Sequence, residues 1–101
     1  MSFPVLTTPQ AEAHIRAIDA WWREHRLAAP ALFTEELAAC FELMGDAPHI
    51  GRPYRSRRVA GVRRLLLRAT HYHVYYVTGE KAVIVLAVWH ARRGTGPKLT
   101  A

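Results

Sequence analysis

The fold of this chain is decided by the stretch VRRLLLRATHYHVYYVTGEKAVIVLAVWH, residues 62–90. Within this stretch, Gly79-Glu80 separates two apolar segments and places glycine at the first central position of a two-residue turn, as a type II′ β-hairpin requires. The stretch therefore predicts three antiparallel strands in an up-down-up meander. The three segments share a richness in Val, Leu, Ile and Tyr, the residue types that suit a pleated sheet: Val62–Arg68, His71–Thr78 and Lys81–His90.

Side chains alternate between the two faces of a strand, so two-residue turns would fix which residues share a face. The first face is nearly all apolar, and we expect helices to cover it: Arg63, Leu65, Leu67, Tyr72, Val74, Tyr76, Val83, Val85, Ala87 and Trp89. The second face mixes apolar residues with Arg, His and Tyr, and we expect function there: Arg64, Leu66, Arg68, His71, His73, Tyr75, Ile84, Leu86, Val88 and His90.

Length and composition predict one small globular domain, residues 1–101. Hydrophobic residues make up 50% and charged residues 22%, which is typical of a folded chain rather than a disordered one. The longest apolar run is too short to cross a bilayer, and the first residues lack a signal-peptide pattern, so we expect no membrane association. A single cysteine, Cys40, excludes an internal disulfide and favours a reducing cytoplasm.

Charge is divided unevenly along the chain. Residues 1–46 hold three Arg and seven acidic residues, whereas residues 47–101 hold nine Arg, two Lys and one acidic residue, Glu80. This asymmetry favours an anionic partner for the second half. Charge alone leaves nucleic acid and an acidic protein equally open, and a solvated basic surface is the simpler alternative for any one arginine.

The acidic half predicts a helical hairpin. Thr8 is a suitable N-cap with Pro9 following it, and helical spacing of apolar residues continues to Arg26. A second helix is expected over 31–44, with Gly45 as its C-terminal stop. We expect His14 and Trp21 to be packing or boundary residues, and Cys40 to be a core thiol rather than a reactive one.

These elements together predict an α+β fold in which an N-terminal helical hairpin packs on one face of an antiparallel three- to four-stranded sheet. Phe3–Thr7 is expected to be a short edge strand, and Tyr54–Val59 either a further strand or a basic loop. The tail after His90 reads ARRGTGPKLTA. Its Gly, Pro and small polar residues predict that residues 91–101 are mobile unless a partner orders them.

The order of these elements and several short sequence motifs resemble those of the RelE/ParE family of bacterial type II toxin–antitoxin toxins, also called plasmid stabilisation proteins. The resemblance covers nearly the whole chain. The motifs that carry the resemblance are the WW pair at Trp21-Trp22, a link with Pro48, Gly51 and Tyr54, VRRLLL at residues 62–67, YHVYYV at residues 72–77, and the closing VWHARRG at residues 88–94. The resemblance implies a toxin that inhibits growth and is neutralised by a cognate antitoxin, with which it would form a hetero-oligomer.

Two subgroups of that family imply different targets. ParE-type members act on DNA gyrase and often end their last strand with a word like His90-Ala91-Arg92-Arg93. RelE-type members are ribosome-dependent mRNA endonucleases, and their basic catalytic positions would fall on Arg64, His73 and Arg92 or Arg93. The C-terminal Tyr of those nucleases has no counterpart here, where the chain reads Gly96-Pro97. The ending therefore favours a ParE-like gyrase inhibitor, with the endonuclease and an inactive, antitoxin-binding relative as alternatives.

We therefore assign contacts on the second sheet face and at its end to the two kinds of partner. The antitoxin, an acidic and amphipathic segment, is expected to cover Tyr75, Ile84, Leu86 and Val88. The target is expected to meet five cationic or titratable side chains: Arg64, Arg68, His90, Arg92 and Arg93.

The sequence predicts neither a metal nor a cofactor. His71, His73 and His90 share the predicted second face, but no Cys or carboxylate stands near them in sequence to complete a zinc site. Structural or partner-contacting histidines are the simpler interpretation. The chain also lacks a glycine-rich phosphate loop, a metalloprotease word and a nucleophile elbow.

Overall fold

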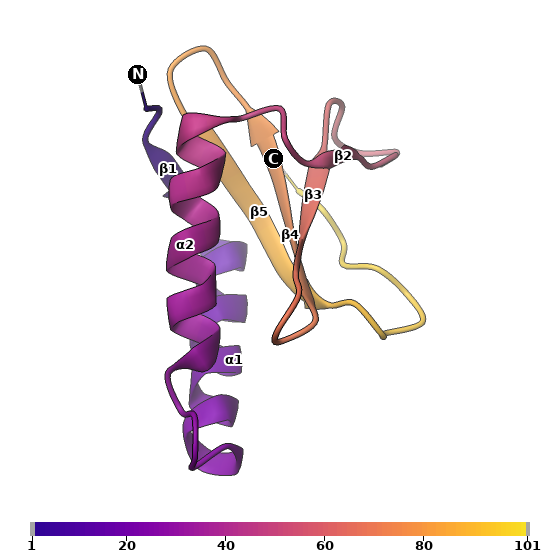
Figure 1. Ribbon diagram of the computed structural model, residues 1–101. Helices are drawn as coiled ribbons and strands as arrows, with labels where there is room; N and C mark the ends of the chain where they lie inside the picture. The colour runs from indigo at the N-terminus through magenta and orange to yellow at the C-terminus, as the bar shows by residue number, and fades with distance from the viewer. Residues whose placement is uncertain (1, 101) are drawn as a thin grey trace.

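Two helices pack on one face of a five-stranded sheet in the computed structural model, which describes residues 2–100 (Figure 1). This confirms the predicted α+β architecture, although the sheet has more strands than expected. Its elements in chain order are β1 (Val5–Thr7), α1 (Pro9–His25), α2 (Leu32–Asp46), β2 (Arg52–Pro53), β3 (Arg63–Leu67), β4 (Tyr72–Thr78) and β5 (Val83–His90).

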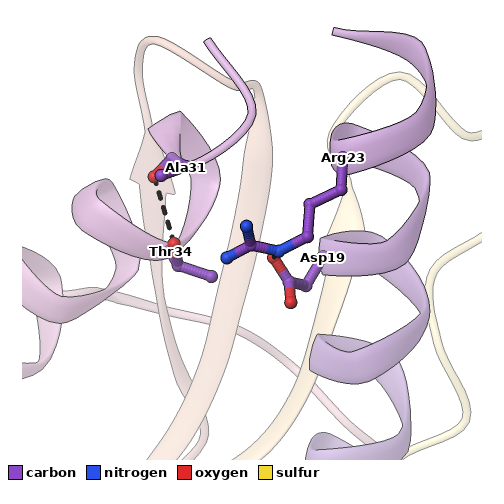
Figure 2. A network of polar contacts seen from close by, with 4 residues as sticks. All are labelled: Asp19, Arg23, Ala31 and Thr34. Carbon is purple, nitrogen blue, oxygen red and sulfur yellow. Dashed lines mark hydrogen bonds and ion pairs between the residues drawn. The ribbon is translucent and has the colours of Figure 1, made fainter. Parts of the chain in front are cut away.

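A side-chain hydrogen bond caps the start of α1, whereas α2 begins without a side-chain cap. The Thr8 hydroxyl accepts a hydrogen bond from the backbone N–H of Ala11 at 3.1 Å, and so caps α1. At the start of α2, the Thr34 hydroxyl donates to the carbonyl of Ala31 at 3.1 Å (Figure 2). Asp19 and Arg23 form an ion pair one turn apart on α1, 3.0 Å between Oδ1 and Nε.

Gly45 does not stop α2, contrary to the prediction. The helix continues to Asp46, and Gly45 lies buried within it. A Cβ atom at this position would stand 2.7 Å from the carbonyl oxygen of Phe3, whose own N–H donates to the carbonyl of Gly45 at 2.9 Å. Glycine is needed here because the backbone leading into β1 approaches the helix closely.

The sheet has the order β1-β5-β4-β3-β2 and is mixed rather than antiparallel throughout. The short strand β1 pairs with β5 in parallel, from Val5 opposite Val83 to Thr7 opposite Val85. A parallel pair is possible because the whole helical hairpin and three strands separate β1 from β5 in the chain. The opening strand was expected at an edge of the sheet, and it lies there.

A β-bulge in β5 changes the predicted faces. The connection before β5 spans residues 79–82, so Thr78 pairs with Val83 instead of forming a two-residue turn. Tyr76 then pairs with Val85 but Tyr75 pairs with Ala87, which leaves one extra residue in β5. Because one extra residue reverses the alternation of side chains, every residue of β5 after the bulge lies on the face opposite to the one predicted for it.

The bulge corrects four predicted positions in β5. Val88 packs in the core beneath the helices, and His90 lies opposite Tyr72 on that same face. Ala87 and Trp89, predicted beneath the helices, belong instead to the apolar cluster on the second face. The faces of β3 and β4, and the positions of Val83, Val85, Ile84 and Leu86, are as predicted.

The main core lies between the helical hairpin and the first sheet face. Trp22 of α1 donates its indole N–H to the Tyr72 hydroxyl at 3.2 Å, and the ring of Phe33 meets that of Tyr72 edge-on. The buried residues of this core are Ala11, Trp22, Phe33, Leu37, Cys40, Met44, Leu67, Tyr72, Val74, Tyr76, Val83, Val85 and Val88. Cys40 is thus a core residue, and burial raises the pKa of its thiol to about 12.

The second sheet face is covered by the chain itself. The tail turns back along the sheet after β5 (Figure 1), and Leu99, only 3% exposed, packs in one cluster with Tyr75 and Leu86. The backbone carbonyl of Lys98 accepts a hydrogen bond of 2.7 Å from the side chain of Gln10. The composition of the tail predicts a mobile segment, whereas in the structure the tail packs over the second face of the sheet.

Candidate functional site

A groove of about 800 Å³ lies between the C-terminal half of α1 and the end of the sheet where β5 finishes. It contains three arginines, three histidines and four large aromatic residues, and no carboxylate side chain lines it. We call it the cationic groove; its lining residues are His14, Ala17, Ile18, Trp21, Trp22, Arg26, Ala69, Thr70, His71, Tyr72, Val88, Trp89, His90, Arg92 and Arg93. Such a lining suits an anionic ligand with apolar parts.

One wall of the cationic groove is the turn between β3 and β4, which α2 holds in place. The carboxylate of Glu36 accepts hydrogen bonds from the backbone N–H of Ala69 at 2.7 Å and from that of Thr70 at 3.0 Å. The Thr70 hydroxyl donates to the same carboxylate at 2.6 Å. His71 then adopts a positive φ of 66°, and its N–H closes the turn onto the carbonyl of Leu67. The groove therefore has a fixed wall on this side.

Aromatic rings hold two of the arginines at the groove. The guanidinium carbon of Arg93 lies 4.4 Å from the ring centroid of Trp89, and that of Arg26 lies 4.8 Å from the ring centroid of Trp21. Both distances allow a cation–π interaction, which orients a guanidinium without neutralising its charge. The indole N–H of Trp89 donates to the carbonyl of Thr95 at 2.8 Å, so the tail in turn fixes Trp89.

Two histidines of the groove have lowered pKa values. Burial first, and then the charge of Arg93, lower the pKa of His14; burial and the nearby Arg92, His71 and Arg93 lower that of His90. Both therefore favour the neutral imidazole. His14 accepts a hydrogen bond at Nδ1 from the N–H of Val88, 3.2 Å away, and His90 accepts one at Nδ1 from the N–H of Arg92, also at 3.2 Å. These histidines shape the groove, while the arginines supply its charge.

The structure separates the five side chains predicted to meet the target. His90, Arg92 and Arg93 line the cationic groove together. Arg64 lies instead on the second sheet face, with its guanidinium 5.1 Å from the ring centroid of Tyr54. Arg68 lines a smaller depression of about 250 Å³ between α2 and β3. The predicted set therefore belongs to three different places on the surface.

The three residues carried over from the RelE-type nucleases are divided in the same way. Arg64 and His73 lie on the second face of the neighbouring strands β3 and β4. Burial, and then the charge of Arg64, lower the pKa of His73. Arg92 follows β5 and lines the cationic groove, whose lining includes neither of the other two. Within residues 2–100, no hydrogen bond or ring contact joins Arg92 to His73 or Arg64.

The predicted antitoxin contacts are not exposed as a patch. Tyr75 is 2% exposed, while Leu86 and Val88 are each 1% exposed; Ile84 is partly buried. The expectation of an open apolar face is wrong for two physical reasons. The tail and residues 54–62 cover the second face, and the bulge turns Val88 under the helices.

Sequence analysis missed the contribution of α1 to the groove. The sequence predicts His14 and Trp21 to be packing or boundary residues and assigns no role to Arg26, whereas all three line the groove. A local signal exists, because Trp22 and Arg26 stand four residues apart and so share one side of a helix. Which part of the sheet that side meets depends on the long-range packing of α1 against β5.

Two further properties concern the described part of the chain. In residues 2–100, no three His, Cys, Asp or Glu side chains are grouped as a metal site would require. Across the same residues, neither helix has the length and hydropathy needed to cross a bilayer.

The fold and the groove define a small α+β protein with a cationic, aromatic cleft at one end of its sheet. The protein-family model described as "ParE toxin of type II toxin-antitoxin system, parDE" matches residues 5–94. The chain belongs to this ParE toxin family, which confirms the RelE/ParE resemblance and the ParE-like subgroup.

A solved structure titled "Chromosomal ParDE TA system from P. aeruginosa" superimposes with a TM-score of 0.67 at 19% identity. The match covers 90% of this chain and 98% of that one, and it shows a common fold. The search of curated proteins gives no match.

Proposed function

We propose that this protein is a toxin that inhibits DNA gyrase by binding it through the cationic groove. The observation that carries the proposal is the groove itself, which brings Arg26, Arg92 and Arg93 together with no carboxylate side chain in its lining. Membership of the ParE toxin family supports this choice of target, because gyrase is what the ParE resemblance implies. Both partners would meet in the cytoplasm.

The chemistry of the groove supports binding rather than catalysis of phosphodiester cleavage. A nuclease needs a general base and a general acid beside a cation that stabilises the phosphate. The groove offers cations, but Nδ1 of His14 and Nδ1 of His90 already accept backbone N–H groups, from Val88 and Arg92 respectively. The residues carried over from the nucleases are also divided between the groove and the second sheet face.

In an interface of this composition, a small number of residues would contribute most of the binding energy. Tryptophan and arginine are the residue types that most often dominate the binding energy of protein interfaces. Trp21 is 41% exposed, and Arg26, Arg92 and Arg93 are also exposed, so these groups are accessible to a partner. A carboxylate-bearing segment of gyrase could pair with the guanidinium groups in a bidentate manner.

Expression in bacteria under an inducible promoter tests the proposal. DNA damage and loss of supercoiling should follow induction while transcripts remain intact. The variant Arg92→Ala/Arg93→Ala should lose this effect, whereas the matched pair Arg16→Ala/Lys81→Ala, which removes the same charge outside the groove, should keep it. Cleaved transcripts with normal supercoiling would instead support the endonuclease.

We also propose that a cognate antitoxin neutralises this toxin. The partner would dock on the depression between α2 and β3, because Leu43 and Leu66 beside it are 45% and 44% exposed. β2 pairs with only Arg63 and Arg64 of β3, which leaves the edge of Leu65–Leu67 free to pair with an added strand. This location replaces the covered residues Tyr75, Leu86 and Val88.

Co-purification with a candidate antitoxin tests this second proposal. Leu66→Glu should abolish co-purification, whereas Leu27→Glu, at a side chain 79% exposed in the loop between the helices, should not affect it. Binding should also weaken as salt is raised, since an acidic partner would be attracted by charge. Retention of the complex by Leu66→Glu would place the antitoxin elsewhere.

A further inference from the structure

An arm of the chain outside the cationic groove concentrates six arginines and no acidic residue. This arginine arm comprises residues 52–64, RPYRSRRVAGVRR, and the nearest acidic residue after it in sequence is Glu80. Only the last two arginines have side-chain hydrogen bonds: Arg63 donates to the carbonyl of Gly51 at 2.8 Å, and Arg64 to the Tyr75 hydroxyl at 3.5 Å. Among residues 2–100 the single ion pair is Arg23 with Asp19, so no ion pair within these residues neutralises the charge of the arm.

The arginine arm is held against the sheet rather than hanging free. β2 pairs with β3, and the N–H of Tyr54 donates to the carbonyl of Val62 at 2.8 Å. Val59 and Val62 are 9% and 2% exposed within the second-face cluster. The Ser56 hydroxyl oxygen accepts hydrogen bonds from the backbone N–H groups of residues 58 and 59, both at 3.3 Å. Arg52, Arg55, Arg57 and Arg58 are therefore displayed in solvent on an anchored loop.

The exposed surface of the arm favours a phosphate backbone over a protein. A protein interface needs buried aromatic or apolar anchors at its centre. The large apolar side chains of the arm are buried or partly buried, and the exposed ones of the molecule lie outside residues 52–64. Contacts to a nucleic-acid backbone need only positive charge and hydrogen-bond donors, both of which guanidinium groups supply.

A duplex fits the arm better than a single strand does. Proteins that bind single strands stack successive bases on exposed aromatic rings. Tyr54 meets the ring of Tyr75 edge-on with centroids 4.9 Å apart, and Arg64 lies over the Tyr54 face. Tyr75 is 2% exposed, so the arm offers no free stacking platform.

We propose that the arginine arm binds the phosphate backbone of duplex DNA without sequence preference. The inference goes beyond the proposed function and does not depend on it, since the cationic groove lies elsewhere and the arm could bind DNA in the absence of gyrase. On gyrase, which itself holds duplex DNA, such an arm would add a second point of attachment.

Fluorescence anisotropy with the full chain and a labelled 20-base-pair DNA duplex tests the proposal. The triple variant Arg55→Ala/Arg57→Ala/Arg58→Ala should bind more weakly than the wild type. Its plot of log K against log salt should be shallower by about 2.7, because each phosphate contact contributes about 0.9. The matched control Arg16→Ala/Lys81→Ala/Lys98→Ala removes the same charge outside the arm and should retain the wild-type slope.

Three outcomes would overturn the proposal: equal slopes for the arm variant and the wild type, an equal loss in the control variant, or tighter binding of a single strand of the same sequence. Displacement of the duplex by a poly-glutamate peptide at equal charge concentration would identify an acidic protein as the partner instead. Circular dichroism checks that each variant is folded. If the triple variant does not fold, the single variant Arg57→Glu should still weaken duplex binding.

Discussion

The guanidinium group of Arg93 lies over the indole ring of Trp89, 4.4 Å from carbon to centroid, at the point where β5 gives way to the tail. Trp89 also packs against His14, whose ring centroid is 5.4 Å away, and donates a hydrogen bond to the carbonyl of Thr95. Strand, helix and tail thus combine to hold one cation at the cationic groove.

Leu67→Ala should destabilise the protein by about 2–5 kcal/mol, because it leaves a cavity beneath the helical hairpin. Leu67 is 3% exposed and packs in the main core. Urea denaturation measures the change, with Leu66→Ala on the exposed side of the same strand as the control. Equal unfolding midpoints for wild type and Leu67→Ala would show that the assigned face of β3 is wrong.

The thiol of Cys40 should resist alkylation in the native protein at pH 8. Burial, and then the charge of Glu36, raise its pKa to about 12, so almost no thiolate is present at that pH. Iodoacetamide labelling followed by mass spectrometry measures the rate, with the denatured chain as the reference. Rapid labelling of the folded protein would place Cys40 outside the core.

The free energy of unfolding should fall as the pH drops below about 6.5. A histidine with a lowered folded-state pKa takes up protons more readily when unfolded, so its stabilisation is complete above the unfolded pKa and is lost on acidification. His14 contributes because its Nδ1 must be unprotonated to accept the N–H of Val88. Urea denaturation at a series of pH values should show a smaller drop for His14→Gln. An identical drop would assign the effect to His73 and His90, whose pKa values are also lowered.

Leu99→Ser should release the tail from the sheet. Leu99 is 3% exposed, and the carbonyl of Lys98 is bonded to Gln10, so trypsin should cut slowly after Lys98 in the wild type. Limited proteolysis with mass spectrometry should detect faster cleavage of this bond in Leu99→Ser. A wild-type chain that is already cut there as fast as the variant would show the tail to be mobile, as its composition suggests.

Sequence patterns were sufficient for the elements that local rules govern. Thr8 and Pro9 mark the start of α1, and the Val- and Tyr-rich segments mark three strands within two residues of their ends. The family's closing motif also singled out His90, Arg92 and Arg93 as target contacts, and the structure brings these three residues together in the cationic groove.

The rest depends on contacts that no local pattern encodes. The register of the β4–β5 pairing shifts between Tyr75 and Tyr76, and no glycine in β5 signals this bulge in the sequence. The bulge nevertheless places Val88 and Trp89 each on the face opposite to the one predicted. The covering of the second face by Leu99 joins residues that lie far apart in the chain. Likewise, α1 supplies Arg26 to the groove only because of how the helix crosses β5.

The variant His73→Ala distinguishes a toxin that binds gyrase from one that cleaves mRNA. His73 lies on the second sheet face outside the cationic groove, so His73→Ala should remain toxic if the groove binds gyrase. Growth after induction measures toxicity, with co-purification of the antitoxin as the check on folding. A folded, antitoxin-binding His73→Ala variant without toxicity would favour the endonuclease.

A supercoiling assay with purified gyrase, relaxed plasmid and this protein measures directly whether the cationic groove inhibits gyrase. The wild type should inhibit supercoiling, and Arg92→Ala/Arg93→Ala should require at least about a hundredfold more protein for the same effect, since two charge-assisted contacts at about 1.5–3 kcal/mol each would be lost. Arg16→Ala/Lys81→Ala should inhibit like the wild type. Undiminished supercoiling at saturating wild-type protein, with messenger RNA cut on ribosomes in a parallel reaction, would contradict the account.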